Sequence, residues 1–210
     1  CCKMSDLDVL TRVITMTLIR EDDLIQSVAD ALQYISYYHP VDFIKAMHEA
    51  YEKEASTAAK DAMAQIPTSV FVVAVRVEAL VTACTISSVV SVDIERQTIS
   101  FVLQKNSSTL KAIRSKKKFG ISLLSDQQTE VSHHFSSLEK DFNEGKFVWD
   151  MQNEDFPTIT NSAGNFNCSL LQTYELENTF IVLAKVEKFC VVTERSPLIY
   201  WNRKHFSLKS

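Results

Sequence analysis

The sequence predicts a mainly β protein, built as a small closed barrel and preceded by an N-terminal α-helical segment. Two observations lead to this fold class. Apolar residues recur at helical spacing between residues 22 and 65, whereas from Thr68 onward they alternate or run together in short stretches. Several short strand-like stretches with two short helical ones suit a small closed barrel. We therefore expect two parts, residues 1–66 and residues 67–210.

Two amphipathic helices are expected in the first part. Residues 22–38 carry apolar residues every three or four positions, and an aspartate stands ready to cap the first turn. Pro40 ends this helix and can begin the next, which runs over residues 41–65 without an internal glycine or proline. Pro67 ends the second helix.

The elements expected after Thr68 are short. The predicted strands cover residues 70–75, 80–84, 89–93, 98–103, 119–124, 166–175, 178–192 and 198–201. Ser107 is expected to cap a helix that ends at Lys116, and Asp126 a helix over residues 127–137. Residues 138–165 are polar and punctuated by glycine and proline, so we expect a long loop or excursion there.

Composition excludes several classes of site and partner. Three glycines in 210 residues leave no glycine-rich phosphate loop of the Walker or dinucleotide type. Five cysteines form no C-x-x-C pair, so we expect reduced thiols and no zinc site. A net charge of −4 gives no general attraction to nucleic acid, and the longest apolar run is too short to span a bilayer. We expect a cytoplasmic protein without a signal peptide and with neither nucleic-acid nor membrane partners.

No hydrolytic or metal site stands out in the sequence. His133 and His134 are adjacent, and neighbouring helical residues point about 100° apart, so they do not chelate one metal well. We interpret them as a surface pair, and assign neither a catalytic residue nor a metal ligand.

A ligand site is expected between Thr85 and Thr109. The hydroxyl-rich loop Thr85-Ile86-Ser87-Ser88 precedes one predicted strand, and the polar cluster Lys105-Asn106-Ser107-Ser108-Thr109 follows the next. Hydroxyls and turn N–H groups bind phosphate oxygens, while nearby apolar residues cover a ring face. The two loops therefore suit a phosphorylated, planar ligand. The alternative stays open that these residues simply end the strands.

The same stretch resembles the flavin reductase-like, FMN-binding split-barrel family. The family's Thr-Ala-Ser-Ser loop, followed by Ser-Val, is similar to residues 85–92, its Ser-x-Thr cluster to residues 107–109, and its Phe-x-Val-Asn-Val-Leu strand to residues 119–124. Its closing strand, Pro-Leu-Val-Tyr-Tyr, is similar to residues 197–201. The resemblance extends from about residue 66 to residue 206 and implies a split β-barrel.

This resemblance implies that the chain binds FMN or FAD and uses NADH or NADPH as reductant. Related split barrels are homodimers with the flavin near the subunit interface. An aromatic residue can border the ring pocket in the strand that Tyr200, Trp201 and His205 match, although a core role for Trp201 is as well supported. The positions that match or neighbour the flavin-binding loops are Thr85, Ile86, Ser87, Ser88, Ser91, Lys105, Asn106, Ser107 and Thr109.

Two departures from the family pattern bear on hydride transfer. Many members carry Gly-Asp-His where this chain has Leu176-Glu177-Asn178-Thr179, and that histidine is linked to the nicotinamide side of the site. The proline-rich turn after the first flavin loop is replaced by Asp93-Ile94-Glu95-Arg96. Flavin binding tolerates these losses more easily than hydride transfer does.

Residues 14–66 carry a second resemblance, to the N-terminal segment of class I iron–sulfur fumarate/tartrate hydratases. The similarity is densest over residues 32–46 and continues to Ile66. Neither the cluster-ligating cysteines nor the large catalytic domain follows. We interpret residues 1–66 as a helical packing or oligomerisation element without hydratase chemistry.

The predicted function is that of an NAD(P)H-dependent flavin reductase, supplying reduced flavin to a partner monooxygenase. Two alternatives remain open. One is a non-enzymatic flavin-binding or storage module, and the other is a scaffold subunit with a degenerate barrel.

Overall fold

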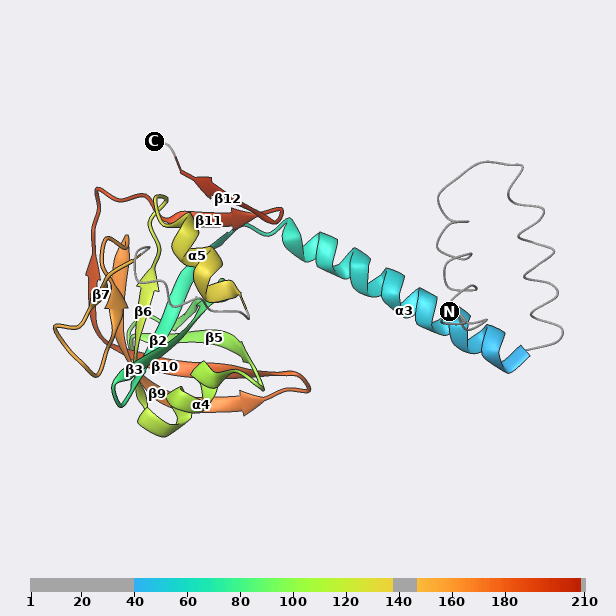
Figure 1. Cartoon of the computed structure of the whole chain (residues 1–210), viewed down its shortest axis with the longest axis horizontal. Coiled ribbons are helices and arrows are strands. Elements are labelled where there is room, and N and C mark those ends of the chain that lie inside the picture. The colour runs from blue at the N-terminus through green and yellow to red at the C-terminus, as the bar shows by residue number, and fades with distance from the viewer. Residues whose placement is uncertain (1–39, 138–146, 209–210) are drawn as a thin grey trace, which may run out of the picture. The chain divides into compact units, whose positions relative to one another are not determined.

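The structure, a computed structural model, describes residues 40–137 and 147–208. The chain divides into two units, Cys1–Ala64 and Gln65–Ser210. Helix α3, Pro40–Ala64, is the described element of the first unit and confirms the helix predicted over residues 41–65 (Figure 1). The helix predicted over residues 22–38 lies outside the described residues.

The second unit is built on a seven-stranded antiparallel sheet with the order β3-β2-β6-β9-β10-β5-β4 (Figure 1). Strands β3 and β4 are the two ends of this order, yet only residues 87–89 connect them, so the sheet curls until its edges approach each other. We call the gap between β3 on one side and β4 and β5 on the other the seam. The seven strands are β2 (Phe71–Val77), β3 (Leu80–Ile86), β4 (Val90–Asp93), β5 (Thr98–Gln104), β6 (Lys118–Leu123), β9 (Gly164–Glu175) and β10 (Thr179–Val191).

Two smaller sheets and two helices complete this unit. The strands of the first small sheet are β1 (Thr68–Ser69), β11 (Leu198–Trp201) and β12 (Lys204–Ser207), and those of the second are β7 (Trp149–Asp150) and β8 (Thr158–Ile159). The helices are α4 (Ser108–Lys116) and α5 (Thr129–Ser136). Strands β1, β7 and β8 were not predicted, because two residues are too few to show an alternating pattern. Strand β12 was not predicted either.

The two predicted helix caps have different outcomes. Ser107 caps α4 as predicted, with its Oγ accepting the Leu110 N–H at 3.3 Å. The prediction that Asp126 caps α5 is wrong, because the helix begins after Gln128. The side-chain amide of Gln128 is buried, and its Oε1 accepts the Ser125 N–H of the preceding turn at 3.0 Å. Asp126 instead accepts a hydrogen bond from the Ser207 hydroxyl on β12.

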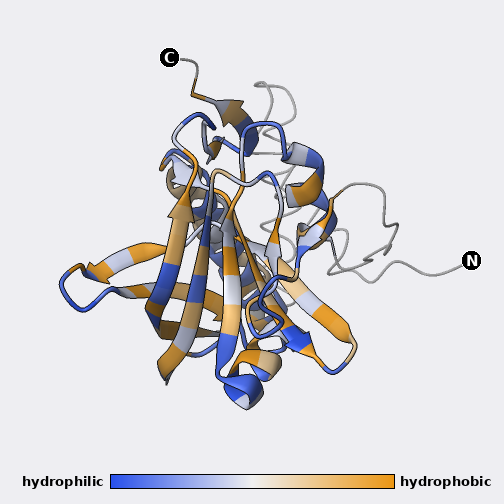
Figure 2. Cartoon of the chain, turned by 90° about the vertical axis from the view of Figure 1, so that its left-hand side faces the viewer, coloured by the Kyte–Doolittle hydropathy of each residue, from blue (hydrophilic) through white to orange (hydrophobic). Residues whose placement is uncertain are grey.

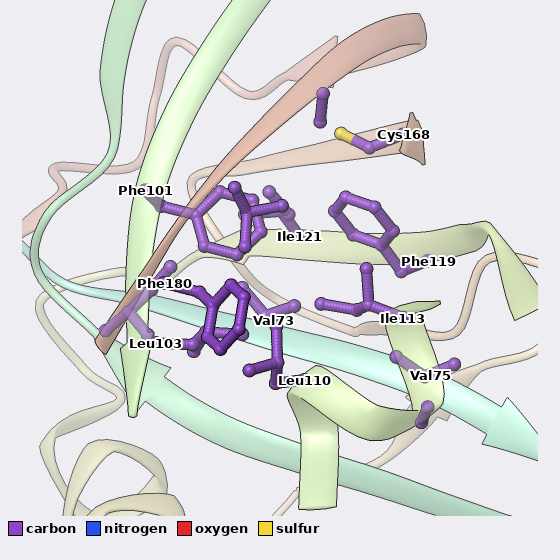
Figure 3. Packing of buried hydrophobic residues seen from close by; sticks show 14 of the residues in the cluster. Val73, Val75, Phe101, Leu103, Leu110, Ile113, Phe119, Ile121, Cys168 and Phe180 are labelled. Atoms are coloured by element: carbon purple, nitrogen blue, oxygen red, sulfur yellow. The ribbon is translucent and has the colours of Figure 1, made fainter. Parts of the chain in front are cut away.

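Two apolar clusters hold the unit together. The first fills the barrel interior, where Phe101 and Phe119 meet edge to face with their ring centroids 5.8 Å apart (Figure 3). The second lies on the other side of β2 and packs α5 there through Val131 and Phe135. Alternate residues of β2 enter the two clusters, so both of its faces are buried and its sequence is a continuous apolar run. Apolar stretches follow the strands and polar ones the turns (Figure 2).

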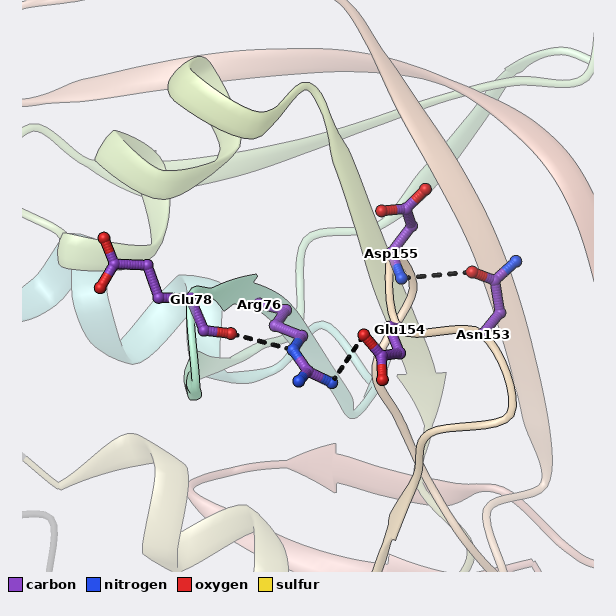
Figure 4. Close-up of polar contacts among 5 residues, drawn as sticks. All are labelled: Arg76, Glu78, Asn153, Glu154 and Asp155. Carbon is purple, nitrogen blue, oxygen red and sulfur yellow. Dashed lines mark hydrogen bonds and ion pairs between the residues drawn. The ribbon is translucent and has the colours of Figure 1, made fainter.

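The described part of the predicted excursion, from residue 147 onward, packs tightly on the outside of β6. A Cβ placed on Gly120 would lie 2.0 Å from the carbonyl oxygen of Pro157, so the two backbones touch directly. Two ion pairs fix the same segment. Lys118 pairs with Asp155 at 2.7 Å, and Arg76 pairs with Glu154 at 3.5 Å (Figure 4). Residues 147–160 are therefore a docked part of the unit.

Candidate functional site

The two predicted polar clusters lie along the seam at different levels of β3. The Thr82 hydroxyl is 3.1 Å from that of Ser108, the first residue of α4. The Thr85 hydroxyl donates at 2.8 Å to the carbonyl of Ser132 in α5. Three residues of extended strand separate Thr82 from Thr85, and because side chains alternate along a strand, the two point to opposite faces of β3. The Thr82 side of β3 packs on the barrel core and the Thr85 side on the second cluster, so α4 and α5 lie on opposite faces of this strand.

The first cluster divides into packing and exposed positions. Ile86 is buried in the barrel core. Ser88, in the loop between β3 and β4, accepts the Val102 N–H of β5 at 3.0 Å and so links this loop to β5 beyond the last β4–β5 pair. Ser87 is exposed, and Ser91 is exposed on β4 opposite Ile99. Ser87 is thus the hydroxyl of this loop that a ligand reaches most easily.

The second cluster surrounds the beginning of α4. Lys105 forms an ion pair of 2.8 Å with Glu175, and this contact holds the pKa of the Glu175 carboxyl below its usual value. Asn106 is exposed in the turn and Ser107 is half-buried. The hydroxyl of Thr109 is fully buried and has no hydrogen-bond partner among the described residues. The first N–H groups of a helix attract anions, so this end of the seam suits a phosphate.

A pocket of about 260 Å³ opens at the other end of the seam, where the first cluster faces α5 and the β11–β12 hairpin. Val70, Ile86 and Tyr200 give it apolar and aromatic walls, and Ser87 lies at its edge. Such walls suit a planar ring. A larger cavity of about 640 Å³, reaching from Asp126 to Arg195, is lined mostly by polar residues and offers a ring less apolar cover.

Two histidines meet in the smaller pocket. The rings of His133 and His205 are edge to face with their centroids 4.9 Å apart, and His205 Nε2 is 3.0 Å from the Ser132 hydroxyl. Burial, and then the neighbouring His133, lower the pKa of His205 below 6.5. The interpretation of residues 133 and 134 as a surface pair is wrong for His134, whose ring lies 5.3 Å from that of Phe147.

The structure thus brings together residues that the sequence left apart. His205 and Tyr200 were expected near a ring, but Ser132 and His133 were not, because their partners are about 70 residues away along the chain. Within residues 40–137 and 147–208, no three metal-binding side chains lie close enough to hold an ion. In that same part of the chain, no helix combines the length and apolar character needed to cross a membrane.

Comparison with known proteins agrees with this geometry. A model of the flavin reductase like domain family matches residues 63–209. A flavin reductase from Pseudomonas putida is 26% identical over 140 residues, which is 66% of this chain and 82% of that protein.

Solved structures share the fold. The flavin reductase of a styrene monooxygenase from Pseudomonas putida S12 superposes with a TM-score of 0.66 at 21% identity, over 72% of this chain and 97% of that one. An NADH:FAD oxidoreductase of Streptomyces globisporus, solved with NAD and FAD fragments, gives 0.68 at 18% identity, over 74% and 94%. The predicted split barrel is confirmed, whereas the hydratase resemblance of residues 14–66 stays a prediction.

Proposed function

Because the chain belongs to the flavin reductase-like family, we propose that it is an NAD(P)H-dependent flavin reductase that binds FMN or FAD along the seam. The observation that carries this proposal is the pocket beside the first polar cluster, whose apolar and aromatic walls suit a planar ring. The N-terminus of α4, which suits a phosphate, adjoins the same strand β3 on its other face.

The residues at the seam fit such a ligand. Ser107 and the first N–H groups of α4 would take the phosphate, and the exposed hydroxyl of Ser87 would bind the chain or the ring. Ile86 and Tyr200 would shield the ring from water. Lys105 would contribute to the site mainly through its ion pair with Glu175, because this carboxylate already binds the Lys105 ammonium group. Ser88 and Thr109 would support the site from behind.

Flavin supplies N5, which accepts a hydride from reduced nicotinamide when the two rings stack at about 3–3.5 Å. The protein's part is then to hold the ring, to exclude water and to leave one face open to NADH or NADPH. The pocket of about 260 Å³, which we call the ring pocket, is bordered by exposed residues, including Ser87 and His133, and so has an open side. Residues 176–179 lack the histidine that many family members carry there. The two imidazoles of the ring pocket come instead from α5 and β12.

The test is the visible spectrum of the protein mixed with FMN, before and after anaerobic addition of NADH or NADPH. A perturbed flavin absorption band at about 450 nm, which bleaches at a rate that depends on the amount of protein, supports the reductase. Binding without bleaching would favour the storage module, and the absence of binding would overturn the flavin proposal.

Matched serine variants locate the flavin. Ser87→Ala and Ser107→Ala should each weaken flavin binding by about 1 kcal/mol, or roughly fivefold, for one lost hydrogen bond. Ser115→Ala, on an exposed position of α4, is the control and should leave affinity unchanged. Equal affinities in all three variants would place the flavin elsewhere.

We further propose that reduced flavin is passed to a separate monooxygenase and that the protein is a homodimer. The structurally similar protein from Pseudomonas putida S12 is the flavin reductase of a styrene monooxygenase. The edge strand β4 and its turn expose Val90, Val92 and Ile94, the last with 82% of its surface accessible. An apolar sheet edge of this kind is normally covered by another chain. Sedimentation analysis of wild type and of Val92→Lys tests the dimer.

A further inference from the structure

The ring pocket contains a pair of imidazoles placed to share one proton. His133 from α5 and His205 from β12 meet with their ring centroids 4.9 Å apart. Two positive charges at this distance repel each other strongly, so the pair takes up one proton much more readily than two. The remaining charged or titratable groups that line the pocket are Tyr200 and Arg203, and its described lining includes no carboxylate. On β12 itself, the neighbouring charged residue is Lys204.

His205 is held by a partner that accommodates both of its protonation states. The Ser132 hydroxyl, 3.0 Å from Nε2, can donate to a neutral imidazole or accept from a charged one. Ser132 is itself fixed, since it is buried, its N–H is bonded to the carbonyl of Gln128, and its carbonyl accepts from Thr85. A proton can therefore arrive at His205 or leave it without rebuilding the pocket.

Burial, and then the neighbouring His133, lower the pKa of His205, so this imidazole favours its neutral form in the ligand-free pocket. A negative charge brought into the pocket acts in the opposite direction and favours the protonated form. A ligand whose ring is negative would therefore bind together with a proton, whereas a neutral ring would not.

We propose that His133 and His205 form a proton-binding pair that takes up one proton when reduced, negatively charged flavin occupies the pocket, and that the pair thereby favours reduced over oxidised flavin. This inference rests on the proposed function, because it requires the flavin ring to enter this pocket. No bond to the flavin is made or broken in the step, since one proton passes from solvent to an imidazole nitrogen. The pair would thus balance the charge that reduction leaves on the ring.

The experiment is anaerobic calorimetric titration of the protein with chemically reduced FMN and with oxidised FMN. Two buffers of different ionisation enthalpy give the number of protons taken up at about pH 7.5, above the ordinary pKa of an imidazole. The wild type should take up about one proton more with reduced than with oxidised FMN. The phosphate is common to both ligands, so its own ionisation cancels in the comparison.

Variants assign the proton to the pair. His205→Gln should lose most of the additional uptake, and its affinity for reduced FMN should fall roughly tenfold more than its affinity for oxidised FMN. His134→Gln, which removes an imidazole from the same helix but outside this pocket, should behave as wild type. Uptake in His205→Gln equal to that of wild type would overturn the proposal, as would the loss of oxidised FMN binding in that variant.

A second variant tests the proposal if His205→Gln does not fold. In His133→Gln, the imidazole proton resonance of His205, followed by NMR without ligand, should titrate at a higher pH than in wild type, because a repelling neighbour is gone. An unchanged titration would refute the pairing. Wild-type protein that binds neither form of FMN would overturn the proposed function itself, whereas binding without extra proton uptake overturns this inference alone.

Discussion

Gly120 is the position where one methyl group should cost the most stability. In Gly120→Ala the new Cβ would lie 2.0 Å from the carbonyl oxygen of Pro157, and the nearest C···O contacts in proteins are about 3.3 Å. The two backbones would have to separate by about 1.3 Å. The excursion resists this movement because Lys118–Asp155 and the bond from the Ile159 N–H to the Ser122 hydroxyl anchor it on both sides of the contact.

We expect Gly120→Ala to lower the free energy of unfolding by about 3 kcal/mol, at the upper end of the range for overpacking. With a urea dependence of about 2 kcal/mol per molar, the unfolding midpoint falls by about 1.5 M. The assay is urea unfolding followed by circular dichroism and by tryptophan fluorescence, since Trp149 lies in the excursion.

Gly164→Ala is the matched control. Gly164 is also buried in the main sheet, but the nearest atom to its added Cβ is the Cys190 carbonyl oxygen at 3.4 Å, an ordinary contact. Its cost should stay within about 1 kcal/mol. If Gly120→Ala proves no more destabilising than Gly164→Ala, the direct contact between β6 and Pro157 is wrong.

Three other predictions follow from single contacts. Ser88→Ala leaves the Val102 N–H without its partner across the seam and should cost about 1 kcal/mol in urea unfolding, whereas exposed Ser115→Ala should cost nothing measurable. Burial raises the pKa of the Cys168 thiol to about 12, so a thiol reagent at about pH 8 should modify exposed Cys190 while Cys168 reacts only on unfolding, as peptide mass spectrometry can show. Because the pKa of His205 is lowered in the folded protein, the unfolded chain binds the proton more readily. The contribution of this group to stability is therefore complete above pH 6.5 and is lost as pH falls below it. A melting temperature of His205→Gln that depends on acid pH in the same way as that of wild type would contradict this.

The strand positions of the main sheet follow from local pattern, whereas the seam does not. The apolar run of β2 and the polar residues after β5 identify a strand and a capped helix without any tertiary information. The use of Ser88 as a bridge depends on an unpaired N–H of β5, fourteen residues away. This role of Ser88 depends on how the sheet closes, which the alternation of apolar and polar residues along a strand does not determine.

The candidate site shows the same division between local and long-range information. The two polar clusters were located by their residue types and by family resemblance, but their separation along β3 depends on where α4 and α5 dock. The error at Asp126 has a similar cause, because Gln128 is drawn into the turn by its bond to Thr160, far along the chain. The imidazole pair was beyond prediction, since His133 and His205 lie far apart along the chain.

The seam also ties folding to cofactor supply. Strand β3 is one end of the seven-stranded order among the described residues, and the candidate flavin site lies beside it. A flavin bound there would bind the folded barrel and not the unfolded chain, and would raise its stability by about 2.7 kcal/mol at a concentration one hundred times the dissociation constant. The barrel would then melt at a temperature that follows the flavin concentration.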